Sequence, residues 1–185
     1  MGRFMNHKKW IAVIALAVTA LILTHLPVSE ADAAASASDF QTQGSTLVKY
    51  RGTEERVTIP DTVEVVGESA FENNQKVQFV VIPKSVKRLD AYVFWGCNNL
   101  EEVVLGKGLT AVDEYSFAGC TGLKQITIPE NIQSIDAQAF AGCVNLTDIY
   151  IPATVTGIAE DAFLNCDNVT IHADEGSVAA QFSQK

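Results

Sequence analysis

Apolar side chains recur along most of the chain at a fixed interval of 23 residues. A phenylalanine, a cysteine and a proline each return at this step, so three independent rows keep one period. Such a pattern predicts a solenoid, in which each repeat leaves its apolar face open until its neighbours cover it. The rows are Phe71, Phe94, Phe117, Phe140 and Phe163; Cys97, Cys120, Cys143 and Cys166; and Pro60, Pro83, Pro129 and Pro152, with Gly106 in the third proline position.

Each repeat contains one short predicted strand. Two aliphatic residues separated by a single position face the same side of a strand, and the proline that follows ends it because proline has no N–H to donate. Successive strands are expected to lie parallel, about 4.8 Å apart, in one long sheet. Short helical or 3-10 turns are expected around segments such as Asp136–Phe140. The inward rows are Val57, Val80, Val103, Ile126 and Ile149, and Ile59, Ile82, Leu105, Ile128 and Ile151.

Both ends of the repeat array have atypical sequences, as the exposed ends of a solenoid require. Residues 34–52 are predicted to form an N-terminal capping hairpin around a glycine turn. Residues 53–168 then hold five repeats, and residues 169–185 a final strand and a capping helix with Ser177 as its N-cap. The expected fold is therefore a leucine-rich-repeat type of solenoid with five 23-residue turns, capped at both ends.

Residues 1–33 are predicted to be a secretory signal peptide. A basic start is followed by an uncharged, mostly apolar run over residues 11–23 and by the small-residue site Ala31-Asp32-Ala33. The apolar run is shorter than the roughly 20 residues of a membrane-spanning helix, although an uncleaved anchor is the alternative. We expect an extracellular protein, either released or associated with the cell surface, with no membrane insertion after cleavage.

Charge and composition limit the chemistry. The net charge of -9 argues against nucleic acid, whose phosphates require a basic surface. Without residues 1–33 only His172 remains among the histidines, and no motif places a nucleophile beside it. A single straight row of thiols does not supply converging metal ligands. We therefore expect no catalysis, no metal and no cofactor, and a monomer.

The four cysteines allow two interpretations. Neighbouring cysteines in a repeat row lie within bonding range, so disulfides between Cys97 and Cys120 or between Cys143 and Cys166 are possible. Stacked side chains point the same way, however, and each thiol follows a phenylalanine that faces inward. A row of buried free thiols is the favoured interpretation.

The repeat Leu123–Pro129, followed by Ala139-Phe140 and Gly142-Cys143, resembles the BspA-like leucine-rich-repeat family. The resemblance extends over roughly residues 47–182. Members of this family are secreted or cell-surface proteins, and several are linked to adhesion. The resemblance implies a binding role toward a protein or another cell-surface ligand.

Residues that alternate with the buried rows point outward and form the candidate partner-binding surface. The alternative is ordinary cross-strand packing in a structural envelope or spacer protein without a dedicated ligand. The candidate residues are Phe79, Val81, Glu102, Val104, Thr127 and Tyr150 on the strands, with Trp95 in a turn.

Overall fold

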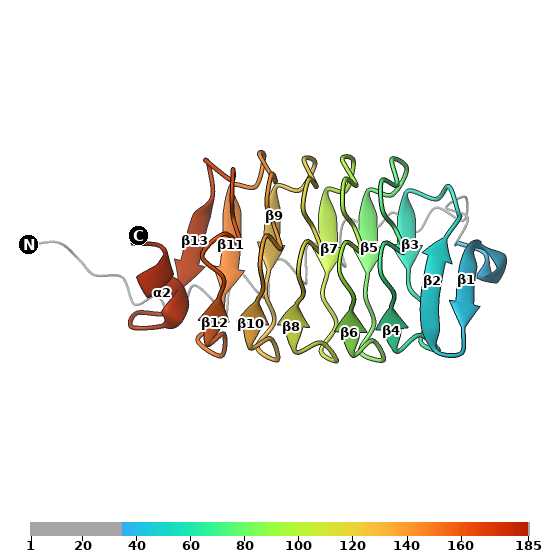
Figure 1. Cartoon of the computed structure of the whole chain (residues 1–185), viewed down its shortest axis with the longest axis horizontal. Coiled ribbons are helices and arrows are strands. Elements are labelled where there is room, and N and C mark those ends of the chain that lie inside the picture. The colour runs from blue at the N-terminus through green and yellow to red at the C-terminus, as the bar shows by residue number, and fades with distance from the viewer. Residues whose placement is uncertain (1–34, 185) are drawn as a thin grey trace, which may run out of the picture. The chain divides into compact units, whose positions relative to one another are not determined.

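A computed structural model describes residues 35–184 of the 185-residue chain, and the predicted signal peptide lies outside these residues. The described part is a parallel β-solenoid, as the repeat pattern predicts. It begins with the 3-10 turn η1 (Ala37–Asp39) and the antiparallel hairpin of β1 (Phe40–Gln43) and β2 (Thr46–Tyr50). From there each turn of the chain contributes two short strands, on two different faces of the solenoid (Figure 1).

The longer strands lie in the row that the sequence predicts. Residues one repeat apart stand side by side, as Val80 and Val103 do, which keeps the inward positions of all turns in register. We call the outward side of this row the strand face. Its strands are β3 (Arg56–Thr58), β5 (Phe79–Val81), β7 (Glu102–Val104), β9 (Gln125–Thr127), β11 (Asp148–Ile151) and β13 (Thr170–Ala173).

A second row of strands, which the sequence did not predict, lies half a turn further along each repeat. Each of these strands has only two residues, too few for an alternating pattern to show. The hairpin joins this row, because β2 pairs in parallel with β4. The strands are β4 (Val65–Val66), β6 (Arg88–Leu89), β8 (Ala111–Val112), β10 (Ser134–Ile135) and β12 (Gly157–Ile158).

Stacked rings form the centre of the core. The ring of Phe117 lies 5.3 Å from that of Phe94 and 5.4 Å from that of Phe140, with planes within 8° of parallel. All three side chains are fully buried. A constant 23-residue step places the same side chain at the same height in every turn, so the row stacks without a gap.

The turns around the phenylalanines are single turns closed by hydrogen bonds between residues three apart, the spacing of a 3-10 turn, and no longer helix forms there. The Cys97 amide donates to the Phe94 carbonyl, three residues back, at 3.1 Å. The chain cannot continue as a helix there, because left-handed residues flank the phenylalanines of the first four turns: around Phe94, Tyr92 has φ 61° and Gly96 has φ 68°. A glycine adopts this conformation without strain, whereas a tyrosine does so at a cost in energy.

The third turn departs from the regular pattern. A Cβ atom at Gly106 would overlap the carbonyl oxygens of the preceding turn, so the proline of the other repeats does not fit there. Both rows of strands are interrupted at this turn: β6 does not pair with β8, and β7 does not pair with β9. The Asn131 amide of the next turn donates to the Gly106 and Leu109 carbonyls and partly replaces the lost backbone bonds.

The two ends are closed by different elements. At the N-terminal end, Tyr50 of β2 stacks on Phe71 at 4.9 Å and is itself covered by Phe40. At the C-terminal end, α2 (Val178–Phe182) begins where the Ser177 hydroxyl accepts a hydrogen bond from the Ala180 amide at 3.1 Å. Phe182 of this helix lies against the edge of Phe163 at 5.9 Å.

The last turn is one residue shorter than the others. Ile149 pairs with Ile171 and Tyr150 with His172, a step of 22 residues. A step of 23 residues would have placed His172 in the buried row beside Ile149. The shorter step keeps Ile171 facing inward and brings the histidine to the strand face.

Candidate binding surface

Six of the seven predicted binding residues lie on the strand face, and all six are partly exposed. Phe79 stands opposite Glu102 in the neighbouring strand, Val81 opposite Val104, and Thr127 opposite Tyr150. The surface therefore has two parts, one on β5 and β7 and the other on β9 and β11.

The first part contains an apolar strip next to a pair of opposite charges. The guanidinium carbon of Arg56 lies 5.4 Å from the ring centre of Phe79, within cation–π range. Partial burial raises the pKa of Glu102, while the nearby Arg56 lowers it. Val81 and Val104 complete the strip. Phe79 is thus available to a partner through its exposed atoms but already has a cation over its ring.

The interruption at the third turn runs through this surface. Val104 and Thr127 occupy equivalent positions in consecutive turns, but their strands are not hydrogen-bonded to each other. At the same place the Lys124 ammonium lies 3.9 Å from a carboxylate oxygen of Glu101, an exposed and therefore weak ion pair.

The second part is a compact polar–aromatic group that the sequence did not reveal. His172 stacks on Tyr150, with ring centres 4.5 Å apart. Its Nε2 lies 2.8 Å from Oδ1 of Asp148, and this contact lowers the pKa of the carboxyl, helped by the hydroxyl of Thr147. The acidic residues nearest to His172 in sequence are Asp174 and Glu175, but its contact is with Asp148 of the preceding turn. Only the shortened last turn reveals its true neighbours.

Trp95 does not belong to this surface. It lies directly after Phe94 in a turn, and 40% of its side chain is exposed. The same repeat position is held by Ala118, Ala141 and Leu164 in later turns. Tyr92, three residues before Trp95, instead stacks on Tyr115, with ring centres 4.7 Å apart. Trp95 is therefore a separate exposed side chain on another part of the solenoid.

The cysteine row is structural, and the free-thiol interpretation is confirmed. All four cysteines are buried and unpaired. Each Sγ approaches the carbonyl oxygen of a phenylalanine in the preceding turn, as Cys120 does with Phe94 at 3.1 Å. Burial raises the pKa of Cys97 to about 12. A thiol of this kind is a poor nucleophile at neutral pH.

Two further features bear on metals and membranes. Within residues 35–184, no three His, Cys, Asp or Glu side chains are grouped so that they could hold a metal ion. In the same part of the chain, no helix has the length and apolar character needed to cross a bilayer.

A family model described as the BspA type leucine rich repeat region matches residues 49–170 in six copies. Five complete repeats were expected from the sequence. Beyond these, strands β2 and β13 extend the two rows at their ends. No curated protein matches the chain.

Several solved structures have the same fold. A leucine rich cell surface protein from Faecalibacterium prausnitzii is 34% identical, with a TM-score of 0.70 over 75% of this chain. A T. pallidum leucine rich repeat protein is 26% identical, with a TM-score of 0.71 over 75% of this chain and 70% of its own. A leucine-rich repeat protein from Bacteroides ovatus is 28% identical, with a TM-score of 0.62 over 72% of this chain. The chain spans 37% of the F. prausnitzii protein and 38% of the B. ovatus protein.

Proposed function

Because the chain belongs to the BspA-type leucine-rich-repeat family, we propose that it is an exported binding module that holds a protein or other cell-surface ligand on its strand face. The single observation that carries this proposal is the partly exposed apolar strip of Phe79, Val81 and Val104 across two adjacent strands. Exposed aromatic and aliphatic side chains with polar residues at their edge are what protein interfaces use as anchors.

Export and a place at the cell surface are part of the proposal. The charged start, apolar run and small-residue site of residues 1–33 support it, as does the description of the F. prausnitzii relative as a cell surface protein. N-terminal sequencing of protein recovered from the medium or the cell surface tests it. The sequence should begin close to residue 34, and recovery of intact Met1 would contradict export by cleavage.

A spacer protein without a ligand is the competing function. Two rings of the strand face already have contacts within the solenoid: Arg56 lies over Phe79, and His172 stacks on Tyr150. Such cross-strand packing stabilises a sheet without any partner. The two functions differ in what removal of the ring side chains does: a spacer loses only stability, whereas a binding module also loses its partner.

The experiment begins with a pull-down from envelope and host-cell extracts, followed by purification of the captured partner. The double substitution Phe79→Ser with Tyr150→Ser removes one ring from each part of the surface. We expect it to weaken binding of the purified partner by at least tenfold, since a buried aromatic anchor contributes about 2 kcal/mol or more. Circular dichroism checks that the fold is retained.

Trp95→Ser is the matched control, because it removes an exposed ring from a different part of the solenoid. It should leave binding of the same partner unchanged. A folded double variant that binds as tightly as the parent would exclude the strand face as the binding site.

A further inference from the structure

The two ends of the solenoid are covered to different degrees. At the N-terminal end, Val66 and Phe71 are fully buried beneath the hairpin and the ring of Tyr50. Their equivalents in the last turn, Ile158 and Phe163, are only partly buried, although α2 packs against β12 and β13. Water therefore reaches these apolar side chains at the C-terminal end, whereas the hairpin excludes it from the equivalent side chains at the N-terminal end.

The reason is the small size of the C-terminal cap. The helix has five residues, of which Ala179 is fully buried and Phe182 reaches the edge of the Phe163 ring. These side chains cover only part of the last turn. Val169 and Ile171 face the core but also remain partly exposed.

The same end has an unpaired strand edge. β13 is the outermost strand of its row, and none of the residues that the structure describes pairs with its outer side. In earlier turns the amide at the equivalent position donates to the following turn, as Ile128 does to Tyr150 at 2.8 Å. Ala173 occupies this position in β13, and Ile171, two residues earlier, has the same orientation. Their backbone groups therefore point outward, beside the exposed apolar side chains.

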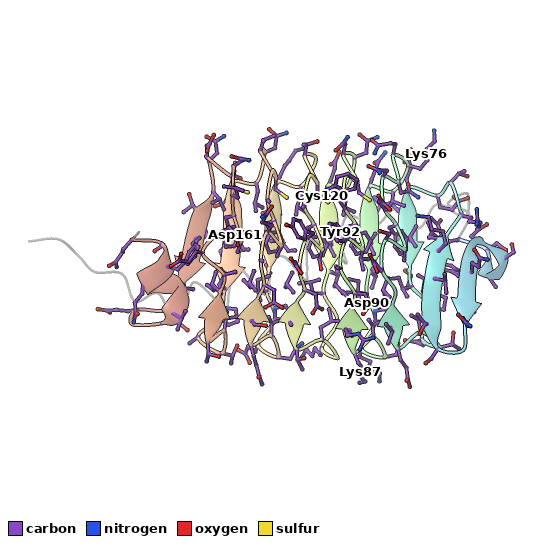
Figure 2. The ribbon with its side chains drawn as sticks, viewed as in Figure 1. Lys76, Lys87, Asp90, Tyr92, Cys120 and Asp161 are labelled. Carbon is purple, nitrogen blue, oxygen red and sulfur yellow. The ribbon has the colours of Figure 1, made fainter. Side chains whose placement is uncertain are left out.

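The charge of this end is strongly negative. No lysine or arginine occurs between Lys124 and Lys185. Basic side chains gather at the other end, where Lys76 and Lys87 project from early turns, while Asp161 lies toward the C-terminal end (Figure 2). The acidic residues between the two lysines are Glu130, Asp136, Asp148, Glu160, Asp161, Asp167, Asp174 and Glu175.

We propose that the C-terminal end of the solenoid docks an extended cationic segment of a partner protein, which adds as a further strand to the outer edge of β13. An unpaired edge offers main-chain hydrogen bonds to an incoming strand. Alternate side chains of that strand would cover Ile171 and Phe163, and the intervening lysines or arginines would face Asp174 and Glu175. The docking site is the outer edge of β13 rather than the outward side of the strands, and the proposal holds whether or not the strand face binds a ligand.

Charge selects this occupant over a second copy of the chain. Two identical ends brought together would place acidic groups against acidic groups, and like charges at an interface oppose association. A cationic strand is attracted by the acidic side chains of this end, and this attraction also raises its rate of association.

The test uses the purified protein and a capped peptide in which lysine and valine alternate. Hydrogen exchange followed by NMR should show the Ile171 and Ala173 amides protected about tenfold at a peptide concentration ten times its Kd. An otherwise identical peptide with alternate backbone amides methylated keeps its charge but cannot pair along one edge. It should bind at least tenfold more weakly and leave the two amides unprotected.

A matched pair of charge reversals locates the site. Asp174→Lys with Glu175→Lys changes the C-terminal end, and Asp61→Lys with Glu64→Lys makes the same change in charge near the N-terminal end. Only the first should weaken the lysine–valine peptide by tenfold or more. Equal weakening by both variants, equal binding of the methylated peptide, or no binding of the unmodified peptide to the parent protein would each overturn the proposal.

Discussion

Tyr150 and His172 lie face to face on the strand face, with ring planes 13° apart, although 22 rather than 23 residues separate them. The histidine also lies 2.8 Å from Asp148, so one imidazole contacts both an aromatic ring and a carboxylate. The carboxylate titrates in the acid range, and its protonation can be followed in solution.

Replacement of His172 by glutamine should raise the pKa of Asp148, because the contact with the histidine is the main cause of its low value. A carboxyl whose pKa is lower in the folded state stabilises the fold above its unfolded pKa of about 3.9, and this stabilisation disappears as the pH falls through the folded value. NMR titration of the Asp148 carboxyl carbon measures the shift. An unchanged midpoint in the variant would show that the contact does not form in solution.

Asp113→Asn should stabilise the protein at neutral pH. Burial and the neighbouring carboxylates Asp136 and Asp90 raise the pKa of Asp113 to about 6, although Arg88 opposes the shift. A carboxyl whose folded pKa lies above its unfolded value binds more protons in the folded state, so stability falls as the pH rises from about 4 to about 6. A shift of this size corresponds to at most ~3 kcal/mol.

Urea unfolding of the parent and the Asp113→Asn variant at several pH values tests this expectation. The variant should be more stable at pH 7.5, and the difference should shrink toward pH 4. The conservative Asp61→Asn, at an exposed position, serves as the control and should have little effect. A variant no more stable than the parent at pH 7.5 would contradict the raised pKa.

Phe117→Ala should lower the free energy of unfolding by roughly 3–5 kcal/mol, because the ring is fully buried between two others. Phe163→Ala should have a smaller effect, since its ring is partly exposed beneath the C-terminal cap. Denaturant unfolding provides both values. Equal losses at the two positions would mean that the last turn is as well covered as the middle of the solenoid.

The four thiols should react with a thiol reagent only after unfolding. Their burial excludes the reagent and raises the pKa of Cys97 to about 12 and that of Cys120 well above its usual value. Thiol titration with and without denaturant should find none and then four reactive groups. Four reactive groups in the native protein would disprove burial, and none after denaturation would indicate disulfides.

Regular repetition made most of the fold predictable. A row such as Phe71 to Phe163 fixes the height, direction and neighbours of each side chain once the step is known, and the structure stacks the phenylalanines accordingly. The outward positions on the strands follow from the same step, so residues such as Phe79 and Val104 could be placed on one surface in advance.

Departures from the step were not predictable, because each depends on contacts between turns. The one-residue shortening before Thr170 places His172 beside Tyr150 on the strand face, whereas a constant step of 23 residues would have put it beside Ile149. The tight approach of Gly106 to the second turn appears in the sequence only as a missing proline. Phe71 lies in the first turn, and the sequence does not show how well its ring is covered. In the structure Tyr50 stacks on this ring, which is fully buried.

The interrupted third turn also gives the rod a preferred place to yield. In a repeat protein each unit is held mainly by the units next to it, so cooperativity passes along the array from neighbour to neighbour. β6 and β8 fail to pair between the second and third turns, and β7 and β9 fail to pair between the third and fourth. At each of these junctions the other row of strands still pairs, and backbone hydrogen bonds beside the phenylalanines remain, such as that from the Phe94 amide to the Ser116 carbonyl at 2.8 Å. Under tension or heat the contacts on the two sides of the third turn should therefore weaken before those between the regular turns.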